Sequence, residues 1–164
     1  MSLAYLGYGS NLGNRVSLIE KGIDEIGRRG IGTVLRRSKM YETEALGVKE
    51  GGDFVNCAVE LMTDLAPHDL LKELRGIEEA LGRARDRDKN SPRTLDIDIL
   101  FYDYMVINDA DLNLPHPEIV NRLFLLTTLK EIRPDLLHPV LRKTMSELLA
   151  EAPAAVQKQR IKPL

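Results

Sequence analysis

Two aspartates stand one residue apart in an otherwise apolar run, PRTLDIDIL, at residues 92–100. Successive side chains of a strand point to opposite faces, so Asp96 and Asp98 are expected on one face and Ile97 on the other. Two carboxylates roughly 7 Å apart repel each other and are costly to remove from water. The spacing predicts that a positive group, such as a divalent cation, lies beside the pair.

A basic segment, RARDRDKNSPR at residues 83–93, leads directly into this strand. Alone, such a segment is typical of a solvated loop. Next to two aspartates it favours a site for a polyphosphate with bound Mg²⁺, because guanidinium groups pair with phosphate oxygens and carboxylates bind the metal. The pair can hold one Mg²⁺ together with phosphate and water, or two ions about 3.5–4 Å apart.

Other interpretations of these residues stay open. An isolated pair of aspartates on a strand also protects a sheet edge from aggregation. A softer metal is not favoured, because the three histidines are scattered and Cys57 is the only cysteine. His116 is either a phosphate ligand, in keeping with the nearby Arg122, or a capping and packing side chain. The glycines of GYGSNLG, residues 7–13, miss the G-x-G-x-x-G spacing, so a tight turn before a helix is predicted there.

The hydrophobic periodicity predicts the elements that position these residues. Strands are expected at residues 3–9, 33–43, 53–62 and 95–101, and helices at about residues 12–27 and 67–82. This is the β-α-β-β-α-β order of an α+β, ferredoxin-like fold, with a mostly antiparallel sheet and helices packed on one face. The last strand is expected to place Phe101 beside Ile97 on the core face and Leu100 with the aspartates.

The rest of the chain predicts additions to this core. A turn at residues 103–104 leads into an extended stretch, MVIN, which suggests a hairpin with the preceding strand. A proline-rich bend and two or three short helices follow as a C-terminal helical extension. Disorder is expected at most in the residues after Pro153.

Length and composition limit the class of protein. The 164 residues suit a single domain, residues 1–164, and the net charge of −2 excludes a general polyanion binder. No apolar run reaches the ~20 residues that a membrane span needs. With one cysteine and no leader pattern, we expect a cytoplasmic monomer with small-molecule partners and neither nucleic-acid nor membrane contacts.

Five stretches then resemble one family in its own order. They are GSNLGNR, YETEALG, DFVNCAVEL, LGRARDRDKNSPRTLDIDILFY and LPHPEIVNRLFLL, spread over about residues 5–135. Together they resemble the 6-hydroxymethyl-7,8-dihydropterin pyrophosphokinases of folate biosynthesis. The resemblance implies a ferredoxin-like fold and transfer of the pyrophosphoryl group of ATP to the pterin hydroxymethyl group, with release of AMP. It also implies two Mg²⁺ ions bound by Asp96 and Asp98.

The resemblance further implies a set of site residues. Those that act on the transferred group are Arg83, Arg93, Asp96 and Asp98. Those that bind ATP are Glu78, Arg85, Ile99, His116 and Arg122. Those that bind the pterin are Thr43, Leu46, Phe54, Asn56 and Phe124, the two phenylalanines forming a sandwich around the flat ring.

This chain also departs from the pattern of the family. Glu44 and Ala45 stand where two prolines are frequent, and Asn90-Ser91 stands where Trp-Gly is frequent. Arg75 replaces a glutamine and Asp111 replaces an arginine of some relatives. We expect the changes at Glu44-Ala45 and Asn90-Ser91 to alter loop closure and turnover while the metal and pterin contacts are kept, and the change at Asp111 to affect a contact with ATP.

Two rivals from other classes share some of these features. A ferredoxin-like RNA-binding module would use the basic segment on phosphates, but the chain lacks the aromatic strand motif for base stacking. A two-metal nuclease would use the same aspartates, but no general base is evident in the sequence.

Overall fold

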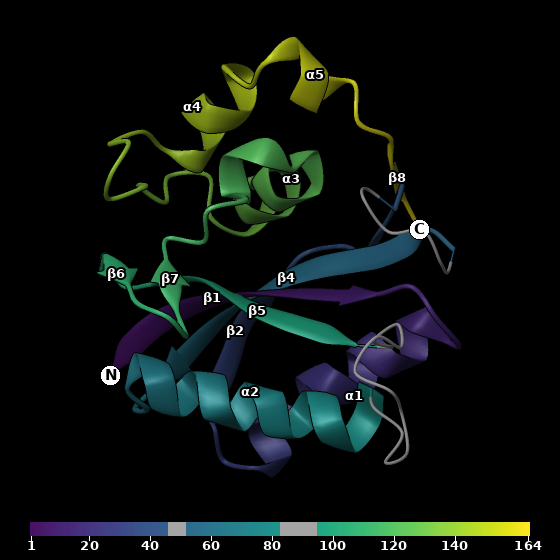
Figure 1. Cartoon of the computed structure of the whole chain (residues 1–164), viewed down its shortest axis with the longest axis vertical. Coiled ribbons are helices and arrows are strands. Elements are labelled where there is room, and N and C mark those ends of the chain that lie inside the picture. Colours follow the sequence, from purple (N-terminus) through teal and green to yellow (C-terminus); the bar gives the residue numbers. More distant parts are fainter. Residues whose placement is uncertain (46–51, 83–94) are drawn as a thin grey trace.

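The computed structural model describes residues 1–45, 52–82 and 95–164 (Figure 1). The strands are β1 (Ser2–Ser10), β2 (Thr33–Arg37), β3 (Tyr41–Thr43), β4 (Phe54–Thr63), β5 (Asp96–Tyr102), β6 (Ile107–Asn108), β7 (Asn113–Leu114) and β8 (Ile161–Pro163). The helices are α1 (Arg15–Arg28), α2 (Pro67–Gly82), the 3-10 helix η1 (Ile119–Asn121), α3 (Leu123–Ile132), α4 (Met145–Ala150) and α5 (Ala154–Gln157).

The main sheet has the strand order β5-β1-β4-β3-β8, and β2 pairs with the other end of β4. All of its pairings are antiparallel. The strand expected at residues 33–43 is divided into β2 and β3 at Ser38. Its hydroxyl accepts the N–H of Ala58 at 2.9 Å and so interrupts the regular backbone ladder. With β2 and β3 counted together, the sheet has the order and connections of the ferredoxin-like fold, as predicted.

Local signals in the sequence set the ends of the first two helices. Asn14 caps α1 by accepting the N–H of Ser17 at 3.1 Å. At the other end Gly30 has a φ of 66°, and the N–H of Ile31 bonds to the carbonyl of Ile26 at 3.0 Å, which is the Schellman arrangement. Helix α2 begins at Pro67, whose missing N–H is not needed in a first turn.

Helices cover both faces of the sheet (Figure 1). One core lies between the sheet and helices α1 and α2, with Ile19, Leu74 and Ile97 fully buried. The second core lies on the opposite face under α3, α4 and α5, and includes Leu129 and Met145. The helical extension therefore covers the face that the two helices of the ferredoxin-like unit leave open.

The expected alternation along the last strand is correct up to Leu100, which lies on the face of the aspartates, and fails at Phe101. The register of β5 with β1 shifts by one residue between Tyr5 and Leu6, which makes Leu100 the extra residue of a bulge. As a result Phe101 lies in the second core, beside Leu100, and not with Ile97 as predicted.

Two further expectations for the chain after β5 are corrected. The turn at residues 103–104 forms, with Asp103 at a φ of 47°, but β6 pairs with β7 and not with β5. The residues after Pro153 are ordered as α5 and β8, and β8 pairs with β3 in the register Thr43↔Ile161. Within the described residues, no helix is both long and apolar enough to span a membrane.

Candidate active site

The two aspartates lie on the sheet face that carries the helical extension. Their neighbours across the ladder are both glycines, since Asp96 stands opposite Gly9 and Asp98 opposite Gly7. Because glycine has no side chain, nothing on β1 covers the carboxylates from that side. The sheet thus offers a bare floor on which a charged group can approach both carboxylates.

A cavity of about 210 Å³ opens above this floor. We call it the aromatic cavity, because the side chains of two phenylalanines, Phe54 and Phe124, help to line it. Its lining residues are Gly7, Tyr8, Gly9, Thr43, Glu44, Phe54, Asn56, Asp96, Asp98, His116, Glu118, Arg122, Phe124 and Leu125.

The pterin-binding residues predicted on the sheet come together in the aromatic cavity. Phe54 and Asn56 lie on the same face of β4, and Thr43 of β3 is in register with Phe54. Asn56 is 4% exposed, and its Nδ2 donates to Oγ1 of Thr43 at 2.7 Å. This bond fixes the plane of the carboxamide, so that Oδ1 lies toward Gly9.

The predicted ATP-binding His116 is held by one hydrogen bond to β5 and one within its own loop. Its backbone N–H donates to the carbonyl of Leu100 at 2.9 Å, at the bulge of β5. Its Nδ1 accepts the N–H of Glu118 at 3.1 Å. Because a neutral ring whose Nδ1 accepts carries its proton on Nε2, the remaining nitrogen is a donor that suits a phosphate or hydroxyl oxygen.

A second cavity, of about 170 Å³, lies beside the first and shares Asp98 and His116 with it. Its other lining residues are Leu71, Arg75, Ile99, Asp111, Leu112, Asn113 and Pro117. Arg75 and Asp111, at which the resemblance implies a departure from relatives, both line this second cavity.

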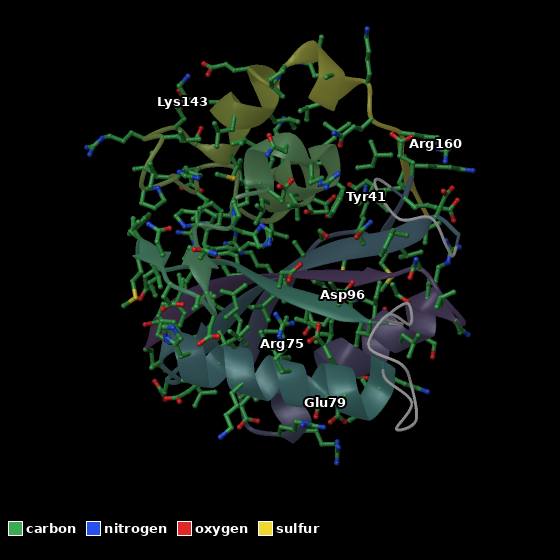
Figure 2. The ribbon with its side chains drawn as sticks, viewed as in Figure 1. Tyr41, Arg75, Glu79, Asp96, Lys143 and Arg160 are labelled. Atoms are coloured by element: carbon green, nitrogen blue, oxygen red, sulfur yellow. The ribbon has the colours of Figure 1, made fainter. Side chains whose placement is uncertain are left out.

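Glu78 lies beneath the strand that carries the aspartates. It is 1% exposed, accepts the N–H of Ile97 at 2.9 Å and pairs with Arg75 at 2.6 Å. Figure 2 shows Arg75 on α2 below the sheet and Asp96 on the sheet itself. The backbone between the two aspartates is thus fixed by Glu78, and the sequence-based role of Glu78 in ATP binding stays a prediction.

Several predicted residues cannot be placed. Leu46, Arg83, Arg85 and Arg93 lie outside the described residues, as does the Asn90-Ser91 pair. Of the described candidates, Thr43, Phe54, Asn56, Asp96, Asp98, His116, Arg122 and Phe124 line the aromatic cavity, and Ile99 lines the second one.

Sequence reasoning missed the glycines of β1. It placed Gly7 and Gly9 at the end of a strand, with Gly9 also in a tight turn, and gave neither a role in the site, whereas both line the aromatic cavity. Their spacing of two residues, which puts both on one face of a strand, was the available signal. Glu118 and Leu125 carried no comparable signal, because the chain brings them to the cavity only through the fold of residues 115–125.

The donor set fits a hard cation that needs few protein ligands. No group of three or more His, Cys, Asp or Glu suited to a metal occurs among the residues that the structure describes. Two carboxylates beside open space match Mg²⁺, which usually keeps waters and substrate phosphates as its other ligands. Cys57 is no alternative ligand or nucleophile, because burial raises the pKa of its thiol to about 12.

A ferredoxin-like sheet whose Asp98 lines both an aromatic cavity and a second cavity suits a transferase that brings two small molecules together. Residues 5–134 match the family model described as 7,8-dihydro-6-hydroxymethylpterin-pyrophosphokinase. The chain belongs to this family, which confirms the family and the enzyme class that its motifs indicated.

Individual relatives agree with the family match. A 2-amino-4-hydroxy-6-hydroxymethyldihydropteridine pyrophosphokinase of Aquifex aeolicus is 38% identical over 151 residues, which cover 92% of this chain and 92% of the relative. The folic acid synthesis protein fol1 of Pneumocystis carinii is 42% identical over 83% of this chain. A crystal structure of the wild-type HPPK-DHPS of Plasmodium falciparum with pteroate has a TM-score of 0.73 at 17% identity over 92% of this chain, which confirms the fold.

These relatives differ in length. The chain spans 18% of the Pneumocystis protein and 42% of the Plasmodium chain. It matches one part of those longer proteins and nearly the full length of the Aquifex enzyme.

Proposed function

We propose that this protein transfers the pyrophosphoryl group of ATP to the hydroxymethyl group of 6-hydroxymethyl-7,8-dihydropterin in folate biosynthesis. The observation that carries the proposal is the position of Asp96 and Asp98. The carboxylates lie on the floor of the aromatic cavity, and Asp98 with His116 also lines the second cavity. A flat acceptor in the first cavity and a nucleotide in the second would meet over these carboxylates.

The aromatic cavity suits a pterin. Phe54 and Phe124 supply ring faces for a planar heterocycle, and Asn56 supplies a neutral carboxamide next to them. With Nδ2 of Asn56 bonded to Thr43, its Oδ1 is left to accept from the N–H groups of the pterin edge. The neighbouring Glu44 and Glu118 add acceptors and no donors, which also favours an amino-substituted ring.

The second cavity suits the nucleotide. Ile99 and Leu112 give apolar contact for a base, while Arg75 supplies a positive charge and Asp111 an acceptor. His116 lines both cavities, and its Nε2–H can bind a phosphate oxygen. Arg122, half-buried and paired with Glu118 at 3.3 Å, lines the aromatic cavity.

At the β-phosphorus of ATP one bond forms and one breaks. The hydroxymethyl oxygen attacks this phosphorus and loses its proton to solvent, the bond from the phosphorus to the α,β-bridging oxygen breaks, and AMP leaves with that oxygen. Such transfers need positioning and charge neutralisation more than covalent participation by the protein. The paired strands that carry Asp96, Asp98 and the two glycines would position the reacting groups.

Asp96 and Asp98 would hold two Mg²⁺ ions. Bound there, the ions would neutralise phosphate charge and lower the pKa of the attacking hydroxyl group. Glu78 keeps the strand between the two ligands in place through the N–H of Ile97. The arginines Arg83, Arg85 and Arg93, which follow from the family resemblance, would add guanidinium contacts to the phosphates.

Charge in the cavity argues against the RNA-binding rival. Four carboxylates line the described part of the aromatic cavity, from Glu44, Asp96, Asp98 and Glu118, and Arg122 is its only described arginine. A polyanion would be repelled there unless divalent cations came with it. We further propose that residues 1–164 act as one monomeric, cytoplasmic domain with ATP and the pterin as partners.

One assay tests the function. The protein is incubated with Mg²⁺, ATP and 6-hydroxymethyl-7,8-dihydropterin, and the nucleotides are separated by chromatography. AMP formed in equal amount to the pterin pyrophosphate is expected. A lack of AMP would overturn the proposal, and release of ADP or inorganic phosphate would assign a different transfer.

A further inference from the structure

The C-terminal segment, residues 159–163, lies outside the part of the chain that matches the family model, which ends at residue 134. Nevertheless it contacts α3, β3 and the residue directly before β4, and α3, β3 and β4 all contribute lining residues to the aromatic cavity. Figure 1 shows β8 to the right of α3, where it forms an edge strand of the main sheet. Figure 2 shows Arg160 at the same end of the molecule as Tyr41.

Gln159 caps helix α3 from outside that helix. The residue before α3 is Arg122, which makes no side-chain cap. Instead Oε1 of Gln159 accepts the N–H of Leu123, the first residue of α3, at 2.9 Å. Its Nε2 donates to the carbonyl of Asn121 at 2.8 Å. One side chain thus satisfies backbone groups on both sides of the start of α3.

The residues at the start of α3 also line the aromatic cavity. Phe124 and Leu125 follow Leu123 directly, and both line the aromatic cavity, as does Arg122 before it. A small cleft behind Phe124 is lined by Gln159, Arg160 and Ile161. Phe124 therefore lines both this cleft, together with the C-terminal segment, and the aromatic cavity.

The same segment also bonds to residues in and beside β3 and just before β4, on the Phe54 side of the aromatic cavity. Ile161 pairs with Thr43 in the β8–β3 ladder, and the N–H of Arg160 donates to Glu44 at 3.1 Å. The guanidinium of Arg160 binds both oxygens of Asp53, at 3.0 and 3.2 Å, directly before Phe54. Glu44 is one of the residues at which this chain departs from its relatives, and here its carboxylate docks the segment.

We infer that Gln159 is a positioning residue for pterin binding, which sets the separation of the Phe54 and Phe124 walls by fixing the start of α3. The inference rests on the proposed function for the identity of the ligand. The hydrogen bonds of the Gln159 side chain go to Asn121 and Leu123 and not to a residue of the second cavity, so the larger effect is expected on pterin binding and a smaller one, through Arg122, on ATP binding. The ion pair between Arg160 and Asp53 contributes less to the position of these walls, because the Arg160 side chain is 66% exposed and exposed ion pairs are weak in water.

The test compares Gln159→Ala with two further variants of the full chain. Gln159→Glu keeps an acceptor for the N–H of Leu123, and a carboxylate is favourable at a helix N-terminus. Gln157→Ala is the matched control, because Gln157 belongs to the same part of the chain but its side chain donates to the carbonyl of Ala152, at 2.7 Å, and not to α3. The readouts are the Kd of 6-hydroxymethylpterin from its fluorescence, the KM values of both substrates, kcat, and hydrogen exchange of the Leu123 amide.

Gln159→Ala is expected to raise the Kd and KM of the pterin about five-fold, which corresponds to about 1 kcal/mol. The KM of ATP and kcat stay within two-fold, and the Leu123 amide exchanges faster. Gln159→Glu and Gln157→Ala remain close to wild type in pterin affinity. An unchanged pterin Kd in Gln159→Ala, or equal losses of ATP and pterin affinity, overturns the inference.

The result is separable from a failure of the proposed function. Wild-type protein that forms no AMP would refute that function. The exchange rate of Leu123 in Gln159→Ala then still reports on positioning, since faster exchange supports the cap and an unchanged rate refutes it.

Discussion

Replacing Gly9 with alanine adds one methyl group to the aromatic cavity and should weaken the binding of the pterin without weakening that of ATP. An alanine Cβ there would lie 2.9 Å from Oδ1 of Asn56 and 3.7 Å from Cδ1 of Phe54. The first distance is shorter than real Cβ contacts, and Asn56 is buried and bonded to Thr43 at 2.7 Å. Since φ at Gly9 is not in the left-handed region, backbone strain does not contribute.

The size of the effect follows from the hydrogen bonds of Asn56. To accommodate the methyl group, the carboxamide must turn or move by a few tenths of an ångström. Either the bond to Thr43 or a bond to the pterin is then lost, at about 1–2 kcal/mol for a buried amide. Gly9→Ala is therefore expected to raise the pterin KM roughly ten-fold, with the KM of ATP within two-fold of wild type.

Steady-state kinetics with each substrate varied in turn measures this split. Gly27→Ala is the control, because a Cβ at Gly27 in α1 meets no atom within 4 Å. A double variant with Asn56→Ala gives a sharper test. If the clash with Asn56 is the cause, Gly9→Ala adds nothing once Asn56 is truncated. Additive losses in the double variant, or an unchanged pterin KM in Gly9→Ala, would refute the reasoning.

Three further predictions concern charged side chains. Asp98→Asn is expected to lower kcat at least ~10²-fold without lowering Tm, because it removes a metal ligand and one of two repelling charges; a large fall in Tm would make the pair structural. Glu78→Ala should cost about 1–3 kcal/mol in urea unfolding, since it leaves the buried N–H of Ile97 without its acceptor, while Glu78→Gln keeps most of the stability; equal stability of the two variants would contradict this. Hydrogen bonds from Arg28 and Arg29 lower the pKa of Glu25 to about 2. The stability from Glu25 is thus complete above about pH 4.5 and is lost as pH falls toward 2, so thermal melts of Glu25→Gln should depend less on pH in that window than those of wild type.

The residues of the reaction centre were predictable because their signal is local. The i, i+2 spacing of Asp96 and Asp98 needs only a strand to put both on one face, and the alternation of Phe54 and Asn56 on β4 works in the same way. The first-turn proline of α2, Pro67, likewise acts within one turn of chain, whereas the cap of α1 is Asn14, about two residues after the expected start of that helix. These features depend on how often side chains return to the same face of a strand or helix, and that spacing can be read directly from the sequence.

Errors appeared where a distant segment decided the outcome. The alternation of β5 fails at Phe101 because the register with β1 shifts at Leu100, and the carbonyl of this bulge residue then binds His116. The residues after Pro153, which composition alone suggests as a loose end, are ordered because β3 offers them an open edge to pair with. Neither partner can be read from the local sequence.

The sequence by itself determined the family, the order of strands and helices, and the carboxylate pair with its expected metal. Only the tertiary structure decided how the cavity is closed. Phe54 and Phe124 come from β4 and α3, and they face one cavity because the helical extension packs on the far face of the sheet. The bare floor of Gly7 and Gly9 and the cap from Gln159 arise in the same way. Cross-strand register and the packing of separate segments depend on the whole core, whereas the periodicity of side chains depends on the backbone alone.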